Sequence, residues 1–297
     1  MNIGQRLMRI LFHGFWAVFL TRATYFLGGA PLRMLRVWAG RTGYWAMGAG
    51  LSLAFYLVNA KLLAGAFFSL VGLMGVFAEL EDVGLSFMVS GAFTLLINSL
   101  VGAGAFAFYV SRTGPKWDHE ILSYLEASLK PLASLSRQFQ IDYHDLLVQM
   151  PSVILMFWAV AIYLAVLMEA RLNGGEPASS HGAQMRAQMA EFRLPDPVVW
   201  VFILSLLGAF GGFSAGAIEV LAVNAMNFCM LLLFFQGIAV VVRVFEHLRM
   251  GAFWQFLTMV LIVLHLFLFV SLLGLLDYWV DFRPRLSKRA EEFNREV

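Results

Sequence analysis

Long apolar stretches alternate along the chain with short polar connections. A transmembrane helix needs roughly 20 predominantly apolar residues with charges confined to its ends. Windows of this kind predict an all-α fold, a polytopic helical bundle that forms a single membrane domain over residues 1–297. The eight predicted spans cover residues 10–30, 44–60, 62–80, 83–110, 152–170, 198–213, 218–242 and 253–275.

The connections between the spans refine this arrangement. A short connection at residues 59–61 joins the second and third spans, and a glycine-rich turn joins the sixth and seventh, so both pairs are predicted to be tight helical hairpins. Arg22 interrupts the first apolar stretch and Pro31 follows it. This pattern favours a retained helix over a cleaved signal peptide.

Three segments break the membrane pattern. Residues 111–150 are predicted to be a cytoplasmic amphipathic insertion, because apolar residues recur there at helical spacing between charges. Such a helix either rests in the membrane interface or docks a partner. Residues 171–197 lack any period and predict a loop, in which Asp196 caps a helix that starts at Pro197. Residues 276–297 form a basic polar tail.

Basic residues near the span ends predict the orientation. The N-terminus, the segment 112–137 and the tail are basic and fall on one side of an eight-span bundle, which predicts that both termini are cytoplasmic in a bacterial inner membrane. Two groups then lie outside. One contains Glu79, Glu81 and Asp82, and the other contains Arg33, Arg36 and Arg41, whose outer position runs against the positive-inside bias.

Composition excludes several classes of protein. Hydrophobic residues make up 60% of the chain and charged residues only 13%, which is too little polar surface to cover a soluble body of this length. The lipid bilayer is therefore the first expected partner. A net charge of +2 gives no reason to expect nucleic acid, and a single cysteine cannot form an internal disulfide.

Polar residues inside the spans are the candidate ligand-binding groups. The fourth span carries three of them at helical spacing and the seventh span carries three amides. Facing stripes of this kind either line a pocket for a small polar solute or hydrogen-bond helices together. His265, in the middle of the eighth span, is a further candidate, and Arg22 and Glu169 are ionisable groups near span ends. The residues of the two stripes are Ser90, Thr94 and Asn98, and Asn224, Asn227 and Gln236.

Glycines and short motifs in the spans have both a structural and a functional interpretation. Gly208, Gly212 and Gly216 predict a small-residue ridge for helix packing. The same stretch places Ser214 in a G-x-S-x-G pattern, which together with His265 leaves an intramembrane serine protease as a minor alternative. His119 and Glu120 begin a zinc-protease motif, but the second histidine is missing. We predict no catalytic residue, no metal site and no cofactor, and thus no enzyme.

Five stretches, in this order, carry a resemblance that covers most of the chain: APLRMLRVWAGRTG, LVQMPSVILMFWAV, RLPDPVVWVFILSLL, LLLFFQGIAVVV and LGLLDYWVDFRPR. The sequence resembles the YybS-like family of bacterial predicted membrane proteins. That family is distantly similar to the S components of energy-coupling factor transporters. S components hold a vitamin or a metal ion and sit against a transmembrane coupling subunit.

The resemblance implies a solute-binding membrane component of a transporter, with the two polar stripes lining the site for an unknown small solute. Because the chain has no nucleotide-binding motif, energy would come from a transmembrane coupling subunit with ATPases. The Ala-x-x-x-Ala contact motif of S components is replaced here by Ala17-x-x-x-Thr21. The alternative function is a non-transporting membrane scaffold or assembly factor, in which the amphipathic segment recruits a partner.

Overall fold

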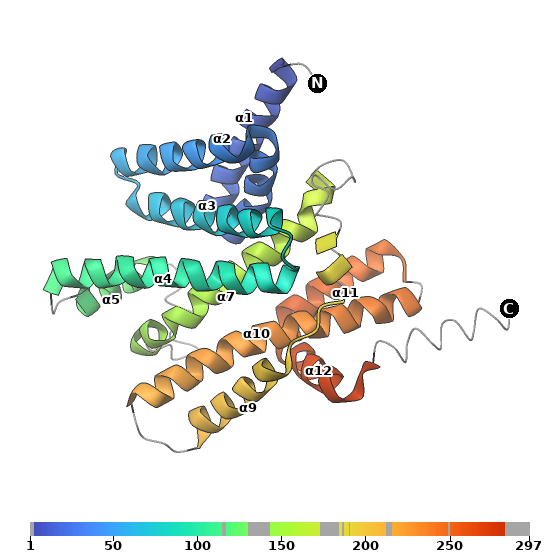
Figure 1. Cartoon of the computed structure of the whole chain (residues 1–297). Helices are drawn as coiled ribbons and strands as arrows, with labels where there is room; N and C mark the ends of the chain where they lie inside the picture. The colour runs from blue at the N-terminus through green and yellow to red at the C-terminus, as the bar shows by residue number, and fades with distance from the viewer. Residues whose placement is uncertain are drawn as a thin grey trace. The chain divides into compact units, whose positions relative to one another are not determined.

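A computed structural model describes residues 3–114, 117–129, 143–172, 184–185, 187–189, 191–211, 216–248 and 250–282. Every regular element among these described residues is a helix (Figure 1), which confirms the predicted all-α fold. The elements are α1 (Ile3–Thr24), the short 3-10 helix η1 (Phe26–Gly28), α2 (Gly29–Leu57), α3 (Lys61–Asp82), α4 (Phe87–Thr113), α5 (Trp117–Leu129), α7 (Tyr143–Leu172), α9 (Asp196–Phe210), α10 (Gly216–His247), α11 (Ala252–His265) and α12 (Phe267–Val280).

Four of the described helices are long and apolar enough to cross a membrane. They are Lys61–Asp82, Phe87–Thr113, Asp145–Glu169 and Gly216–Phe245. The bent pair formed by α11 and α12 would make a fifth span. The count of eight spans stays a prediction.

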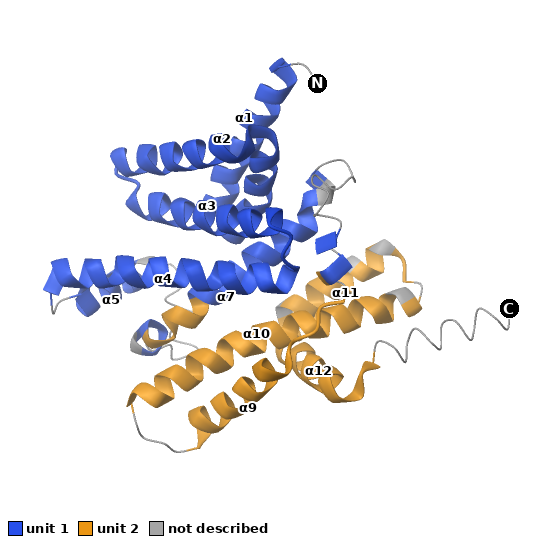
Figure 2. Cartoon of the chain, in the orientation of Figure 1, with its two compact units in different colours: residues 1–147, 154–188 blue, residues 148–153, 189–297 orange. Residues whose placement is uncertain are grey.

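The helices divide into two compact units (Figure 2). The first unit contains residues 1–147 and 154–188, and the second contains residues 148–153 and 189–297. Each unit is described by itself below. The single membrane domain stays a prediction.

Helices α2 and α3 pack together as a hairpin in the first unit, as the short connection between them predicts. Their shared core holds large apolar side chains, among them Phe67 and Phe77. Tyr44 is fully buried there and donates a hydrogen bond from its hydroxyl to the carbonyl oxygen of Val71 at 2.8 Å. The polar end of this buried ring is thereby satisfied.

The connection between the first two predicted spans is helical. Residues 31–43 belong to α2, which begins with a buried segment, Gly29–Leu35. Just before α2, the backbone of Gly28 lies against α1. A Cβ atom on Gly28 would lie only 2.1 Å from the Thr21 hydroxyl oxygen. Only glycine permits this close approach, which brings the start of α2 into the core.

A shared hydrogen bond ties α7 to the N-terminal helices. The indole Nε1 of Trp158 lies 2.9 Å from the hydroxyl of Tyr25 and 3.0 Å from that of Ser69, and it donates to both oxygens. Tyr25 lies between α1 and η1, and Ser69 belongs to α3. The contact fixes the position of α7 within the first unit.

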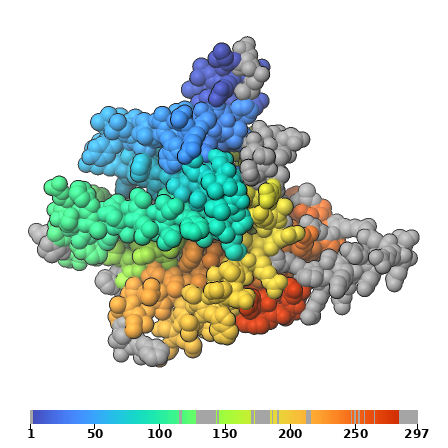
Figure 3. Space-filling model, in the orientation of Figure 1, coloured from blue at the N-terminus to red at the C-terminus, as the bar shows by residue number. Residues whose placement is uncertain are grey.

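Helix α4 is apolar and exposed along most of its length, and it forms a prominent part of the viewed face in Figure 3. Its first backbone N–H, that of Phe87, donates to the side-chain oxygen of Gln188 at 2.6 Å. Gln188 belongs to the segment predicted as a loop, whose described part is helical at residues 184–185 and 187–189. This segment therefore satisfies an unpaired N–H at the start of α4.

Helix α5 begins at Trp117 and ends at Leu129, within the predicted amphipathic insertion. Residues 115–116 and 130–142 of that predicted insertion lie outside the described residues. Helix α7 starts at Tyr143, before the predicted span boundary at residue 152, and continues through Pro151. Helix α9 begins at Asp196 with Pro195 at its N-cap position, so Asp196 does not cap the helix as predicted.

Close glycine packing joins α10 and α12 in the second unit. A Cβ atom on Gly237 would lie 2.0 Å from the carbonyl oxygen of Val270, and one on Gly274 would lie 2.0 Å from that of Leu233. Glycine at both positions lets the two backbones touch, as small residues do in membrane helix pairs. Neither glycine stands out in the sequence alone.

The predicted glycine ridge does not lie on one helix. Gly208 belongs to α9, Gly216 begins α10, and Gly212 and Ser214 lie outside the described residues. Helix α9 ends at Phe210, which separates the first glycine from the last. Gly208 still marks a close contact, since its Cβ atom would lie 2.8 Å from the Cβ of Ala222 on α10.

The predicted eighth span, residues 253–275, is not one straight helix. It breaks at Leu266, and the segments Phe253–Val263 and Phe267–Val280 are bent by 99°. The packing of α12 on α10 supplies a reason, because the close glycine contact and the bond from the Ser271 hydroxyl to the Met230 carbonyl fix its direction. Tertiary contacts here override the helical continuity that the apolar pattern predicts.

Candidate functional site

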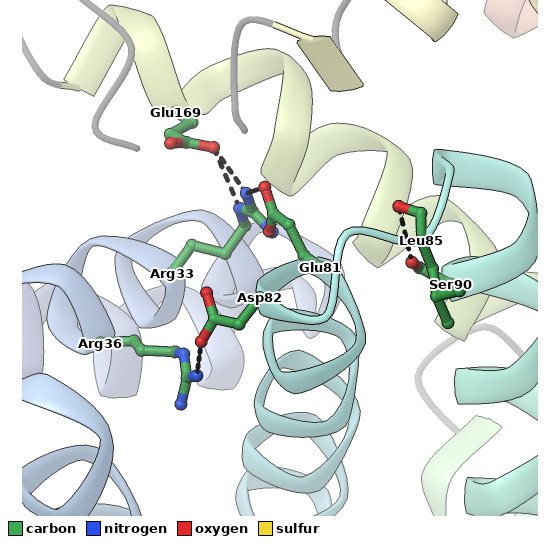
Figure 4. A network of polar contacts seen from close by, with 7 residues as sticks. All are labelled: Arg33, Arg36, Glu81, Asp82, Leu85, Ser90 and Glu169. Carbon is green, nitrogen blue, oxygen red and sulfur yellow. Dashed lines mark hydrogen bonds and ion pairs between the residues drawn. The ribbon is translucent and has the colours of Figure 1, made fainter. Parts of the chain in front are cut away.

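Three buried charges meet in the first unit (Figure 4). The guanidinium group of Arg33 lies between two carboxylates, with Nη1 2.9 Å from Glu81 and Nη2 2.7 Å from Glu169. The Nε of Arg33 donates to the same Glu169 oxygen at 3.2 Å. All three side chains are at most 5% exposed, so this is a buried triad of one cation and two carboxylates.

Each member of the triad lies at an unfavourable helix end. Arg33 is near the start of α2, where the helix dipole is positive, while Glu81 and Glu169 are near the ends of α3 and α7, where it is negative. Burial lowers the pKa of Arg33, but the charges of Glu81 and Glu169 outweigh it and raise the pKa above its ordinary value. The arginine therefore stays charged, and it stabilises both carboxylates.

A second group of ion pairs surrounds the triad. Arg36 pairs with Glu79 at 2.8 Å and also with Asp82, and Arg41 pairs with the other oxygen of Glu79 at 2.9 Å. The indole of Trp45 donates to Glu79 at 3.3 Å. Glu79 thus binds three donors that all come from α2.

A break in α2 brings Arg36 and Arg41 to the same carboxylate. Five residues apart on a regular helix, the two side chains would point about 140° away from each other. Gly40 interrupts the helix with φ 76° and ψ 173°, a conformation that is nearly exclusive to glycine. The resulting kink redirects Arg41 toward Glu79.

These charges line a cavity of about 200 Å³. Since a water molecule takes up roughly 30 Å³ in the liquid, the cavity suits a small solute rather than a large one. Arrangements of three or more His, Cys, Asp or Glu side chains that could hold a metal ion are absent from the described part of the chain. The lining residues are Arg33, Arg36, Val37, Arg41, Ala78, Glu81, Asp82 and Glu169.

The polar stripe predicted on the fourth span belongs to α4 in the first unit. Ser90 and Thr94 are fully buried, and Asn98 donates to the carbonyl oxygen of Thr94 on its own helix at 2.9 Å. The Ser90 hydroxyl lies 3.4 Å from the Leu85 carbonyl oxygen (Figure 4). None of the three lines the charged cavity.

Asn224 binds the backbone of α7 beside a proline in the second unit. A proline inside a helix removes one backbone donor and crowds the preceding turn. The Asn224 side chain accepts from the N–H of Ser152 at 2.9 Å and donates to the carbonyl of Val148 at 2.9 Å, two groups one turn apart in α7 and next to Pro151. The amide thus gives partners to backbone groups near the proline, as neighbouring helices do for proline in membrane helices.

The other two amides of α10 also bond to protein atoms. Asn227 donates to the side-chain oxygen of Gln149 at 3.1 Å. Gln236 is fully buried, accepts from the N–H of Leu194 at 3.0 Å and donates to Asp277 at 3.2 Å. The α4 and α10 residues belong to different units. Their role as ligands to a solute stays a prediction.

The remaining candidates are placed as follows. His265 is at the exposed end of α11 instead of mid-span, because the helix breaks after it. Glu169, predicted to lie near a span end, is buried in the ion-pair triad and lines the cavity. Arg22 is exposed on α1.

Comparison with known proteins gives a family. A family model described as a predicted membrane protein, DUF2232, matches residues 10–278. The chain belongs to this family. No curated protein and no solved structure matches the sequence. Membership in the DUF2232 family agrees with the helical fold and with the apolar helices, and it places the protein in a lipid bilayer.

The charged residues of the cavity were recognisable in the sequence, but their ion pairs were not predicted. It placed Arg33, Arg36 and Arg41 on the same predicted side as the carboxylates at the end of the third span. The outer position of these arginines conflicted with the positive-inside bias. That conflict was the signal, because ion pairing to carboxylates gives the arginines a structural reason to lie there.

Proposed function

We propose that the protein is a solute-binding component of a membrane transporter, similar to the S components of energy-coupling factor systems and to the YybS-like family. The observation that carries this proposal is the charged cavity of the first unit. Ligand sites are concave and have a few convergent polar groups. A cavity with three arginines and three carboxylates, framed by apolar helices, has this character.

The predicted orientation indicates from which side of the membrane the solute would enter the cavity. In the eight-span arrangement the start of α2 and the ends of α3 and α7 all lie outside the cytoplasm. The cavity would then open to the exterior of a bacterial inner membrane and receive its solute from there. A buried triad beneath it gives the site a rigid base.

Energy and partners follow from what the chain contains. Its sequence has no nucleotide-binding motif, so the proposal includes a transmembrane coupling subunit with ATPases as separate chains. It assigns no catalytic step to the protein. The second candidate is a scaffold or assembly factor, which is favoured by the structural use that Asn224 and Gln236 make of their amides.

Purification of the full chain in mild detergent, followed by native mass spectrometry, tests this proposal. We expect a bound small molecule that is lost in Arg36→Gln, together with a copurifying chain that carries a nucleotide-binding motif. Lys61→Gln, at the opposite end of α3, is the matched control and should retain the molecule. Stable protein partners with no small molecule in either form would favour the scaffold instead.

A further inference from the structure

We propose that the cavity takes a small zwitterion with one primary ammonium group and one carboxylate, the chemical class of aliphatic α-amino acids. This inference rests on the proposed solute-binding function and names its substrate class. It follows from the hydrogen-bonding groups that the ion pairs leave available at the cavity mouth.

The donors at the mouth come from Arg41. Its Nε is paired with Glu79, while the side chain is 73% exposed and makes no other ion pair among the described residues. The two terminal nitrogens of its guanidinium group therefore remain available. A guanidinium group with two free nitrogens binds a carboxylate through two parallel hydrogen bonds.

The acceptor at the mouth comes from Asp82. One of its oxygens pairs with Arg36, and its side chain is 62% exposed. Its second oxygen has no partner among the residues that the structure describes, which leaves it available for an ammonium group. Arg41 and Asp82 line the same cavity, so opposite charges of one solute can be bound together.

The rest of the cavity limits the solute. Arg33 directs its donors to Glu81 and Glu169, so the base of the site has little capacity for a further anion. Val37 and Ala78 complete the lining with small apolar surfaces, which suit a short aliphatic side chain. An anion alone would leave the second oxygen of Asp82 without a donor at the mouth, and a cation alone would leave the terminal nitrogens of Arg41 without an acceptor.

Binding of three matched probes to the full-length protein tests the inference. L-Valine carries both charges, isobutylamine only the ammonium group, and isovalerate only the carboxylate. Calorimetric titration of the protein in detergent should show L-valine binding at least roughly tenfold tighter than either single-charge probe, because each lost charged hydrogen bond is worth a factor of this size. Equal binding of all three probes, or no binding of L-valine, would overturn the inference.

Two variants assign the charges to residues. Arg41→Gln should bring L-valine to the affinity of isobutylamine, and Asp82→Asn should bring it to that of isovalerate, with melting temperatures unchanged. Lys61→Gln serves again as the control. If neither variant weakens L-valine, the site assignment is wrong. A small molecule of another class, retained by the purified protein, would refute this inference and leave the proposed function standing.

A phosphatidylethanolamine headgroup carries a similar pair of charges. The titration is therefore repeated in nanodiscs of phosphatidylethanolamine and of phosphatidylglycerol. We expect equal L-valine affinity in both. Loss of binding in phosphatidylethanolamine alone would assign the site to the lipid and overturn the assignment to a soluble solute.

Discussion

Arg33→Leu is expected to destabilise the protein by about 3–5 kcal/mol, because it leaves two buried carboxylates without their cation. Glu81 and Glu169 are both nearly inaccessible to water and lie at the negative ends of their helices. Neither can be solvated where it is. The free energy of unfolding, measured by denaturant titration in detergent micelles, reports the loss.

Two comparisons make this result specific. Arg22→Leu removes an exposed arginine from α1 and should change stability by less than about 0.5 kcal/mol. A triple variant in which Arg33, Glu81 and Glu169 all become leucine should recover most of the loss, since an apolar replacement of a whole buried ionic group is often neutral. Equal stability of Arg33→Leu and Arg22→Leu would show that the triad does not form.

Asn224→Leu is expected to cost about 2 kcal/mol, because it removes two hydrogen bonds to backbone groups of α7 beside Pro151. Asn227→Leu is the matched control on the same helix. Its bonds are to side chains, so it should cost only about 0.6 kcal/mol, the average for a hydrogen bond between membrane helices. The same unfolding titration measures both changes.

A double-mutant cycle tests the cause. Pro151→Ala removes the ring that crowds the preceding turn of α7 and restores the N–H that bonds to the Leu147 carbonyl. The backbone of α7 then depends less on an outside partner, so Asn224→Leu should cost clearly less in the Pro151→Ala background than in the wild type. Equal costs in the two backgrounds, or a cost no larger than that of Asn227→Leu, would contradict a role of Asn224 in supporting α7 at the proline.

The apolar pattern predicted the fold class because the length of an apolar stretch that crosses a membrane is set by the thickness of the bilayer. The residue bounds of α3, α4 and α10 agree within a few residues with those of three predicted spans. The pattern was wrong where contacts between helices decide the backbone. The apolar pattern does not mark the break at Leu266 or the buried start of α2. Gly28, Gly237 and Gly274 permit the close contacts at these places, but the sequence does not show which backbone each one contacts.

The sequence predicted which polar residues lie in or near the spans, but not which of them contact each other. Amides such as Asn224 were identified as polar groups in an apolar helix, but a sequence does not state which backbone groups need a partner. Proline at position 151 was the available signal, since a membrane helix that contains proline requires compensation from its neighbours. The charged cavity joins residues 33, 81 and 169, which are far apart in the chain.

The central claim is that the charged cavity opens to the exterior and receives a solute there. Val37 lines the cavity and is 41% exposed, so Val37→Cys in a Cys229→Ala background places one thiol at the site. We predict that a membrane-impermeant maleimide labels this thiol in intact cells. Ser123→Cys, on the predicted cytoplasmic helix α5, should react only after permeabilisation. Labelling of Val37→Cys only in permeabilised cells would contradict the account.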